Sequence, residues 1–154
     1  MAMKGKVGAE TEIRSCASKF FNLVVTQLHQ VQNMTDVIHQ TKLHQGDDWH
    51  GVGSHSVKHW TFSSGGKVVD CKEHIEEIDN ANKTVLFKLF DGDFGEDKYK
   101  SVKLKFKVVE NGEGDIVKWT LKFEKVHEAI PPPLDQLDSL IKATKEVDAF
   151  LLKA

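Results

Sequence analysis

Strict alternation of hydrophobic and polar residues dominates this chain and predicts an antiparallel β-sheet. Apolar residues occupy every second position in several segments, with mostly polar residues between them. A period of two places such residues on one face of a strand. The apolar members of these segments are Trp60 and Phe62; Val85, Phe87 and Leu89; Val102, Leu104, Phe106 and Val108; and Val117, Trp119, Leu121 and Phe123. Each strand is therefore expected to bury one face and to expose the other.

A further strand is predicted near the start of the chain, over Lys4–Ile13, where small and apolar residues again lie two apart. Turn signals separate the later strands at intervals of about 10 to 17 residues. They are Ser-Ser-Gly-Gly at 63–66, Asp-Asn-Ala-Asn at 79–82, Asp-Gly-Asp at 91–93 and Asn-Gly-Glu-Gly at 111–114. Short turns between half-buried strands predict an antiparallel meander.

Two stretches show helical spacing instead. After Ser15, a residue type that often caps helices, apolar residues recur three and four positions apart and predict a helix of about three turns. These residues are Ala17, Phe20, Phe21, Val24 and Val25. A second short helix is predicted over Gln27–Asn33.

The longest predicted helix ends the chain and follows the proline run 131–133, which cannot continue a strand ladder. Its apolar stripe comprises Leu134, Leu137, Leu140, Ile141, Thr144, Val147 and Leu151. Acidic residues come early and lysines later, which suits the helix dipole. About 20 residues at 1.5 Å each span roughly 30 Å, so this helix could cross the whole sheet.

A single helix about 10 Å wide covers roughly two strands of such a sheet. Two arrangements satisfy this constraint. Either the sheet closes tightly over a packed core, or an apolar cavity remains between sheet and helix. Periodicity alone leaves both open.

Composition narrows the class of protein. The chain has 154 residues, with 21 lysines and arginines against 23 acidic residues and a net charge of -2. One domain spanning 1–154 is expected, with no nucleic-acid partner because no basic segment stands out. No apolar stretch reaches the roughly 20 residues of a membrane span, and Met1–Arg14 is too polar for a signal peptide, so no stable membrane insertion is expected. Cys16 and Cys71 are expected to be reduced thiols.

Two candidate sites, a nucleotide-binding loop and a histidine metal site, lack the residues or the spacing that their chemistry requires. Gly46 and Gly51 have the separation of a nucleotide-binding loop, but Val52 stands where the lysine belongs and a strand follows. His55 and His59 would lie about 13 Å apart along a strand, too far to share one ion. The sequence therefore predicts no catalytic residues, no metal and no cofactor.

Several short motifs, in their order along the chain, resemble the major latex protein group. They are Gly5-Lys6-Val7 with Glu10 and Glu12, Trp49-His50-Gly51, the segment 56–60 (Ser-Val-Lys-His-Trp), Phe123-Glu124-Lys125, and Pro132 before the last helix. The glycine-bearing loop 46–54 between the second and third strands adds to the likeness. This group belongs to the START-like superfamily of plant pathogenesis-related class-10 proteins and birch pollen allergens. The resemblance covers essentially the whole chain.

The resemblance implies an α+β helix-grip fold. In that fold, a curved seven-stranded antiparallel sheet wraps around the long C-terminal helix, two short helices follow the first strand, and a large hydrophobic cavity lies inside. The group's members bind hydrophobic or amphipathic molecules such as steroids, flavonoids, fatty acids and hormones, and some are linked to plant defence and stress. The resemblance thus predicts a non-enzymatic carrier, a monomer or weak dimer, in the cytosol of a plant cell.

Mapping the inward positions onto this fold predicts the cavity wall. The sheet and first helix would contribute Leu23, Trp60, Phe62, Val85, Phe87, Leu89, Val102, Leu104, Phe106, Val117, Trp119 and Leu121. The last helix would contribute Leu137, Leu140, Ile141 and Thr144. The polar candidates near that face are Asp70, Thr144 and Asp148.

Enzymes in the superfamily provide the main alternative, a cavity enzyme of condensation or isomerisation that uses a lysine and a carboxylate. Lys122 has outward parity. Lys58 is a candidate inward lysine near the mouth, although a lysine that reaches the surface is the favoured interpretation. A ribonuclease proposal in this superfamily needs a glutamate and a tyrosine late in the last helix, where this chain has Asp148 and Phe150. Two titratable side chains with shifted pKa values, within hydrogen-bond reach of each other in the cavity, would make the enzyme the better hypothesis.

A third possibility is a hormone sensor that closes loops over its ligand. It would need mobile loops at Asp91–Asp97 and Gly65–Gly66, and the gate and latch signatures of abscisic-acid receptors are not evident in the sequence.

Overall fold

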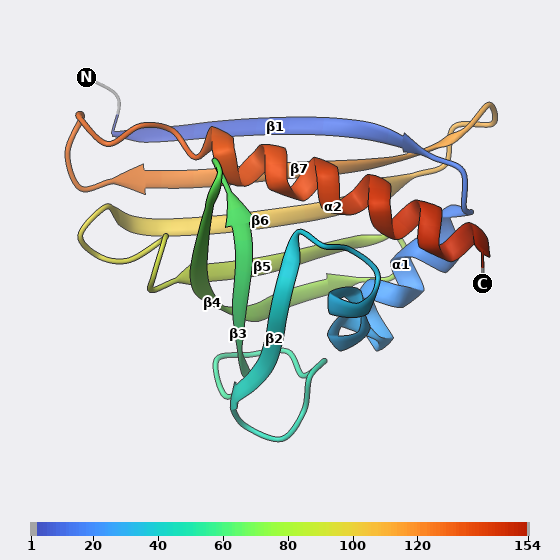
Figure 1. The fold of residues 1–154 in the computed structure, drawn as a ribbon, viewed down its shortest axis with the longest axis horizontal. Coiled ribbons are helices and arrows are strands. Elements are labelled where there is room, and N and C mark those ends of the chain that lie inside the picture. Colours follow the sequence, from blue (N-terminus) through green and yellow to red (C-terminus); the bar gives the residue numbers. More distant parts are fainter. Residues whose placement is uncertain (1–2, 154) are drawn as a thin grey trace.

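One strongly curved sheet forms the body of the protein in the computed structural model, which describes residues 3–153 (Figure 1). Its seven antiparallel strands lie in the order β1-β7-β6-β5-β4-β3-β2. They are β1 (Lys4–Ile13), β2 (Ile38–Gln45), β3 (Val57–Ser64), β4 (Lys67–Asp79), β5 (Thr84–Phe90), β6 (Tyr99–Val109) and β7 (Asp115–Lys125). Consecutive strands from β2 to β7 are neighbours, and β1 completes the sheet beside β7. The predicted meander is confirmed.

Three helices accompany the sheet within the described residues 3–153. They are α1 (Ala17–Thr26), the 3₁₀-helix η1 (Leu28–Asn33) and the long α2 (Leu134–Lys153). Figure 1 shows α2 running along the inner side of the sheet, while β2 and β3 are steeply inclined to β5, β6 and β7. The α+β helix-grip fold implied by the resemblance is therefore confirmed, with both short helices in their expected place.

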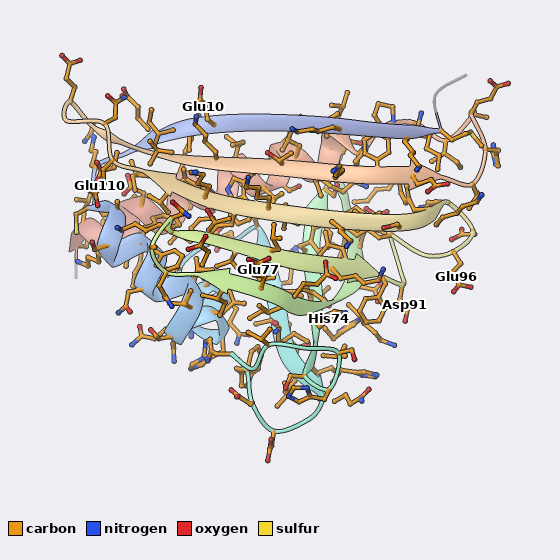
Figure 2. The ribbon with its side chains drawn as sticks, turned by 180° about the vertical axis from the view of Figure 1, so that it is seen from behind. Glu10, His74, Glu77, Asp91, Glu96 and Glu110 are labelled. Carbon is orange, nitrogen blue, oxygen red and sulfur yellow. The ribbon has the colours of Figure 1, made fainter. Side chains whose placement is uncertain are left out.

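The outer face of the sheet is polar, as the alternating pattern predicts. Figure 2 shows this face from behind, with Glu10, Glu77 and other charged side chains on it. Lysines stand directly opposite one another across its strands, as in the register pairs Lys88 with Lys103 and Lys103 with Lys122. Their apolar neighbours in sequence point to the other side and build the interior.

The interior is tightly packed at the end of the sheet near α1. The fully buried Phe106 ring stacks on Phe20 and Phe21 at centroid distances of 6.0 and 6.4 Å. The centroid of the Trp119 ring, on the neighbouring strand β7, lies 4.9 Å from that of the Phe106 ring. Both arrangements left open by the sequence therefore occur together: a packed core at this end of the sheet, and a cavity farther along it.

Two local predictions about the helices are wrong. Ser15 does not cap α1, whose N-cap is Cys16 without a side-chain bond. The Ser15 hydroxyl instead donates a hydrogen bond to Asp148 of α2 at 2.6 Å. This bond attaches the chain between β1 and α1 to the end of that helix. Leu134 does not belong to the buried stripe either; it is the first residue of α2 and is 51% exposed.

Candidate functional site

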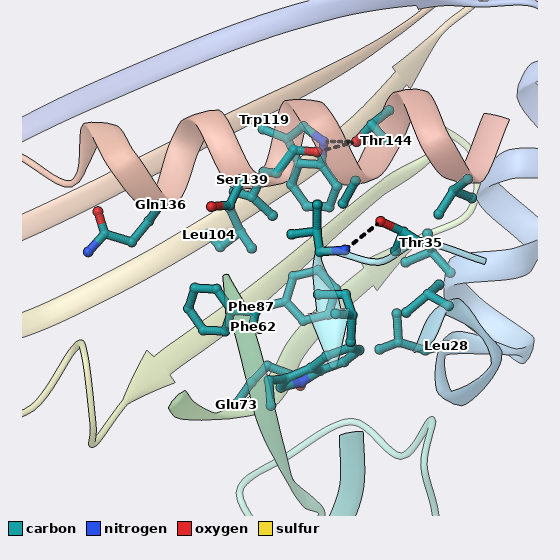
Figure 3. Close-up of a pocket in the computed structure, with 18 of the residues that line it drawn as sticks. Leu28, Thr35, Phe62, Glu73, Phe87, Leu104, Trp119, Gln136, Ser139 and Thr144 are labelled. Atoms are coloured by element: carbon teal, nitrogen blue, oxygen red, sulfur yellow. Dashed lines mark hydrogen bonds between the residues drawn. The ribbon is translucent and has the colours of Figure 1, made fainter. Parts of the chain in front are cut away.

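An apolar cavity of about 160 Å³ lies between the sheet, α2 and the segment from α1 to β2 (Figure 3). Part of its wall is a single transverse row of the sheet, in which Phe87 of β5, Leu104 of β6 and Leu121 of β7 stand opposite one another. Leu140 and Ala143 of α2 face this row from the helix side. The cavity thus occupies the middle of the curved sheet.

Many of the predicted wall residues line this cavity. They are Leu23, Trp60, Phe62, Phe87, Leu89, Leu104, Trp119, Leu121, Leu140 and Thr144. Their role in binding a ligand stays a prediction.

The remaining predicted wall residues lie elsewhere. Val85, Val102, Phe106, Val117 and Leu137 are buried in the packed core, and the half-buried Ile141 lines no part of the cavity. The reason is visible in the register. Val85 and Phe106 are paired in the row on one side of the cavity row, and Val102 and Phe123 are paired in the row on its other side, so both pairs lie at the margins of the cavity. Trp119 and Leu89, in these same rows, still reach it. Parity specifies the face of a strand, whereas the extent of a cavity along the strand depends on what packs against each row.

Other lining residues were not predicted from the sequence. The segment from α1 to β2 contributes Phe20, Val24, Leu28, Val31, Thr35, Val37 and Ile38, and the rest are Cys71, Glu73, Phe94, Gln136, Ser139, Ala143 and Val147. The inward parity of β4, which buries Cys71, Glu73 and Ile75 in alternation, could have revealed Glu73. The curvature that brings η1 over the cavity leaves no comparable signal in the sequence.

Most polar groups in the wall already bond within the protein. Thr144 donates its hydroxyl to the Leu140 carbonyl at 2.7 Å and accepts the Trp119 indole N–H at 2.8 Å. Ser139 donates to the Ser63 carbonyl at 2.6 Å. Thr35 and Gln136 are likewise engaged, with Glu146 and Asp93. These hydrogen bonds hold α2 and the loops in place, and they leave few free polar groups for a ligand to bond.

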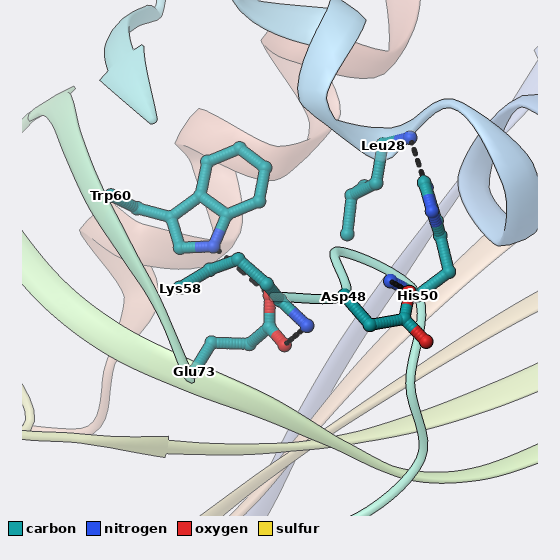
Figure 4. A network of polar contacts seen from close by, with 6 residues as sticks. All are labelled: Leu28, Asp48, His50, Lys58, Trp60 and Glu73. Atoms are coloured by element: carbon teal, nitrogen blue, oxygen red, sulfur yellow. Dashed lines mark hydrogen bonds and ion pairs between the residues drawn. The ribbon is translucent and has the colours of Figure 1, made fainter. Parts of the chain in front are cut away.

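Glu73 is different, because it places a buried carboxylate in this apolar wall (Figure 4). Its Oε1 accepts the Trp60 indole N–H at 3.0 Å, and its Oε2 lies 2.8 Å from the ammonium of Lys58 on the facing strand. Lys58 and Glu73 are directly paired in the register of β3 and β4. Lys58 is fully buried, so the expectation of a lysine reaching the surface is wrong.

The contact between these two charges is an ion pair rather than a well-directed hydrogen bond. Within residues 3–153, neither Lys58 Nζ nor Glu73 Oε2 has a hydrogen-bond partner of acceptable geometry, despite their short separation. Burial raises the pKa of Glu73 above its ordinary value of 4.5, whereas the nearby Lys58 charge and the hydrogen bond from Trp60 oppose that rise. The two opposite charges compensate each other's burial, and a further hydrogen-bond donor at Glu73 Oε2 would add to this stabilisation.

The cavity also contains a thiol. Cys71 is buried, and burial raises its pKa well above 9.0, with the negative charges of Glu73, Asp70 and Asp93 adding to the effect. The thiol therefore stays protonated and unsuited to nucleophilic chemistry.

The glycine-bearing loop is attached to the helical side of the cavity through His50. Its Nε2 accepts the backbone N–H of Leu28, a lining residue, at 3.0 Å (Figure 4). Burial and the nearby His29 lower the pKa of His50, more than Asp48 raises it. The bond requires an unprotonated Nε2, and the lowered pKa is consistent with that. Gly46 turns the loop with a φ of +86°, and a Cβ there would lie 2.5 Å from the His55 carbonyl oxygen.

Two of the polar residues predicted near the cavity lie outside it. Asp70 points away from the interior and pairs with His59 at 2.8 Å on the outer side. Asp148 is buried but accepts the backbone N–H groups of Arg14 and Ser15 and the Ser15 hydroxyl. It is a structural residue at the junction of β1 and α1.

Two further absences concern the described part of the chain only. No three His, Cys, Asp or Glu side chains in residues 3–153 gather closely enough to hold a metal ion. None of the helices described here is long and apolar enough to cross a membrane.

A curved seven-stranded sheet wrapped around one long helix is the architecture of a helix-grip protein. Residues 2–154 match the model of the Pathogenesis-related protein Bet v 1 family. The chain belongs to this family.

Similar proteins place it in the major latex protein group within that family. MLP-like protein 43 of Arabidopsis thaliana is 34% identical, over 98% of this chain and 95% of its own length. Major latex protein 149 of Papaver somniferum is 29% identical, covering 96% and 91%. The crystal structure of major latex-like protein 151 from Panax ginseng superposes with a TM-score of 0.88 at 33% identity, covering 97% and 98%. The predicted resemblance is confirmed.

Proposed function

We propose that this protein binds and carries hydrophobic or amphipathic small molecules in the cavity, in the cytosol of a plant cell, in a role connected with defence or stress. The main support is an apolar cavity. Apart from Glu73, most polar groups in its wall already form hydrogen bonds within the protein. Such a wall favours burial of an apolar ligand and supplies few groups that could catalyse a reaction of that ligand. Family membership supports the same proposal.

The hydrophobic effect limits the expected affinity. Burying roughly 300 Å² of apolar ligand surface at about 25 cal/mol/Å² is worth on the order of 7 kcal/mol, before association and ordering costs of several kcal/mol. Binding driven by shape alone is therefore weak to micromolar and tolerant of ligand identity. Discrimination requires a polar group in the wall.

Displacement of a fluorescent apolar probe tests the proposal. The folded protein is titrated with the neutral single-ring fluorescent probe 4-(dimethylamino)benzonitrile and then with a panel of phenols, fatty acids, flavonoids, steroids and hormones. Saturable uptake at one site, reversed by particular competitors, is the expected result. A folded protein that takes up neither probe nor ligand would contradict the proposal. Light scattering on the same samples tests the proposed monomer or weak dimer.

One observation favours a second candidate, an acid–base enzyme acting on a cavity-bound substrate. Lys58 and Glu73 lie within reach of each other, Glu73 faces the cavity, and burial raises its pKa. The carrier remains the first proposal because the two charges neutralise each other and only Glu73 lines the cavity. Catalysis would require a free acid and a free base at the same substrate.

Recovery of the ligand separates the two candidates. A carrier returns its ligand chemically unchanged after long incubation, as judged by mass spectrometry. Conversion of more than one ligand per protein molecule, lost in Glu73→Gln, would make the enzyme the better proposal.

The hormone-sensor alternative has less support. Its two candidate loops already contact α2: Gly65 packs against Asp135, and Asp93 accepts a bond from Gln136 at 2.6 Å. These contacts attach both loops to α2.

A further inference from the structure

We infer that the cavity selects small, single-ring ligands that carry one neutral hydroxyl or N–H donor, and that Glu73 is the group that accepts this donor. The inference rests on the proposed carrier function and specifies its ligand. It is drawn from the size of the cavity, from the unfilled bonding capacity of Glu73, and from the charge balance around it.

Size favours a single ring. The cavity measures about 160 Å³. An apolar protein cavity of about 150 Å³ suffices to bind benzene, whereas pockets for drug-sized ligands measure roughly 300 to 1,000 Å³. A fused four-ring skeleton therefore exceeds this volume, although a large cavity is what the resemblance to the family implies.

The polar chemistry of the wall favours a hydrogen-bond donor on that ring. A carboxylate has about four lone-pair sites, and Glu73 uses Oε1 for Trp60 and only a poorly directed contact at Oε2 for Lys58. Lys58 does not line the cavity, so a ligand meets the carboxylate. A wholly apolar ligand would leave Glu73 Oε2 with the Lys58 contact only, whereas a donor on the ligand would add a hydrogen bond to it.

Charge balance favours a neutral donor. Lys58 and Glu73 form a buried pair with no net charge, and they are 0% and 3% exposed. A cationic amine would add an uncompensated charge to this apolar site, and an anion would face the Glu73 carboxylate. A phenol or a comparable neutral hydroxyl satisfies the acceptor without either cost.

Three matched ligands test the inference by isothermal titration calorimetry: 4-methylphenol, 4-methylanisole and toluene. All have one ring, and only the phenol can donate a hydrogen bond. We expect 4-methylphenol to bind about tenfold tighter than toluene, since a hydrogen bond to a charged group is worth about that factor. The anisole should gain nothing over toluene.

A variant removes the acceptor while keeping the charge balanced. In Lys58→Met/Glu73→Met the preference for 4-methylphenol should reverse, because its hydroxyl would be buried without a partner. The matched control is Lys103→Met/Glu76→Met, which removes a cross-strand ion pair of 3.3 Å on the outer face of the sheet. The control should keep the wild-type preference.

Each outcome decides a separate point. Equal binding of 4-methylphenol and toluene by the wild type would overturn the role of Glu73, and tighter binding of a sterol than of 4-methylphenol would overturn the size limit. Both results leave the carrier function standing. Failure of the folded wild type to bind any of these ligands or the fluorescent probe would overturn the carrier function as well. If the cavity variant does not fold, the three ligands on the wild type decide alone.

Discussion

Trp119 on β7 donates its indole N–H to the Thr144 hydroxyl on α2 at 2.8 Å, and this bond joins the sheet to the long helix at the wall of the cavity. Thr144 in turn donates to the Leu140 carbonyl one turn earlier in the helix. The indole ring rests on Phe106 of the packed core. The bond therefore connects three parts of the fold: core, cavity and helix.

Substitutions that break the Trp119–Thr144 hydrogen bond should lower the free energy of unfolding, and the effects of the two substitutions should be energetically coupled. Trp119→Phe and Thr144→Val should each lower the free energy of unfolding by about 1 kcal/mol or more. The double variant should lose about 1 kcal/mol less than the sum of the two, because the shared bond can be lost only once. Urea unfolding of all four proteins measures this. Strict additivity would show that the bond contributes nothing.

Filling the cavity should prevent ligand uptake. Ala143 of α2 lines the cavity, whereas Ala149 on the same helix is exposed. Ala143→Phe should reduce probe uptake at least about tenfold, because the ring occupies the space that a ligand needs. The matched control Ala149→Phe should bind like the wild type. Equal loss in both variants would place the probe outside the cavity.

Asp148 should prove structural rather than functional. Asp148→Ala removes the acceptor of three hydrogen bonds from Arg14 and Ser15, two of them buried. We expect the free energy of unfolding to fall by roughly 2–4 kcal/mol. Asp138→Ala, at an exposed position of α2, should change it by less than about 0.5 kcal/mol. Similar small effects of both changes, measured by thermal or urea unfolding, would contradict the assigned role.

His50 should make the stability of the protein depend on pH. Its pKa is lowered in the folded state, so the unfolded chain binds the proton more readily. The contribution of the neutral ring is complete above the ordinary pKa of 6.5 and is lost as the pH falls below that value toward the folded pKa. His50→Gln should lessen this loss, and the exposed His44→Gln should not. Unfolding by urea from pH 8 down to pH 5 tests the prediction; identical pH profiles for wild type and His50→Gln would contradict it.

The fold was largely predictable from the sequence. Period-two alternation identifies the strands and their buried faces, since side chains of a strand alternate between its two sides. It placed Phe87, Leu104 and Leu121 on the inner face, and the apolar stripe of the last helix indicated what would cover them. These features are local, so neighbouring residues suffice to specify them.

The site depended on contacts that sequence spacing does not specify. Glu73 and Lys58 face each other only because β3 and β4 pair in one particular register, and no spacing along the chain indicates that Lys58 has a buried acidic partner. Likewise, Phe106 shares the inner face with Leu104 but lies in the core, because α1 packs on its row of the sheet. The sequence by itself determined which side chains point inward. Only the tertiary structure decided which of them meet a neighbour and which border open space, because packing against distant segments determines where the cavity begins and ends.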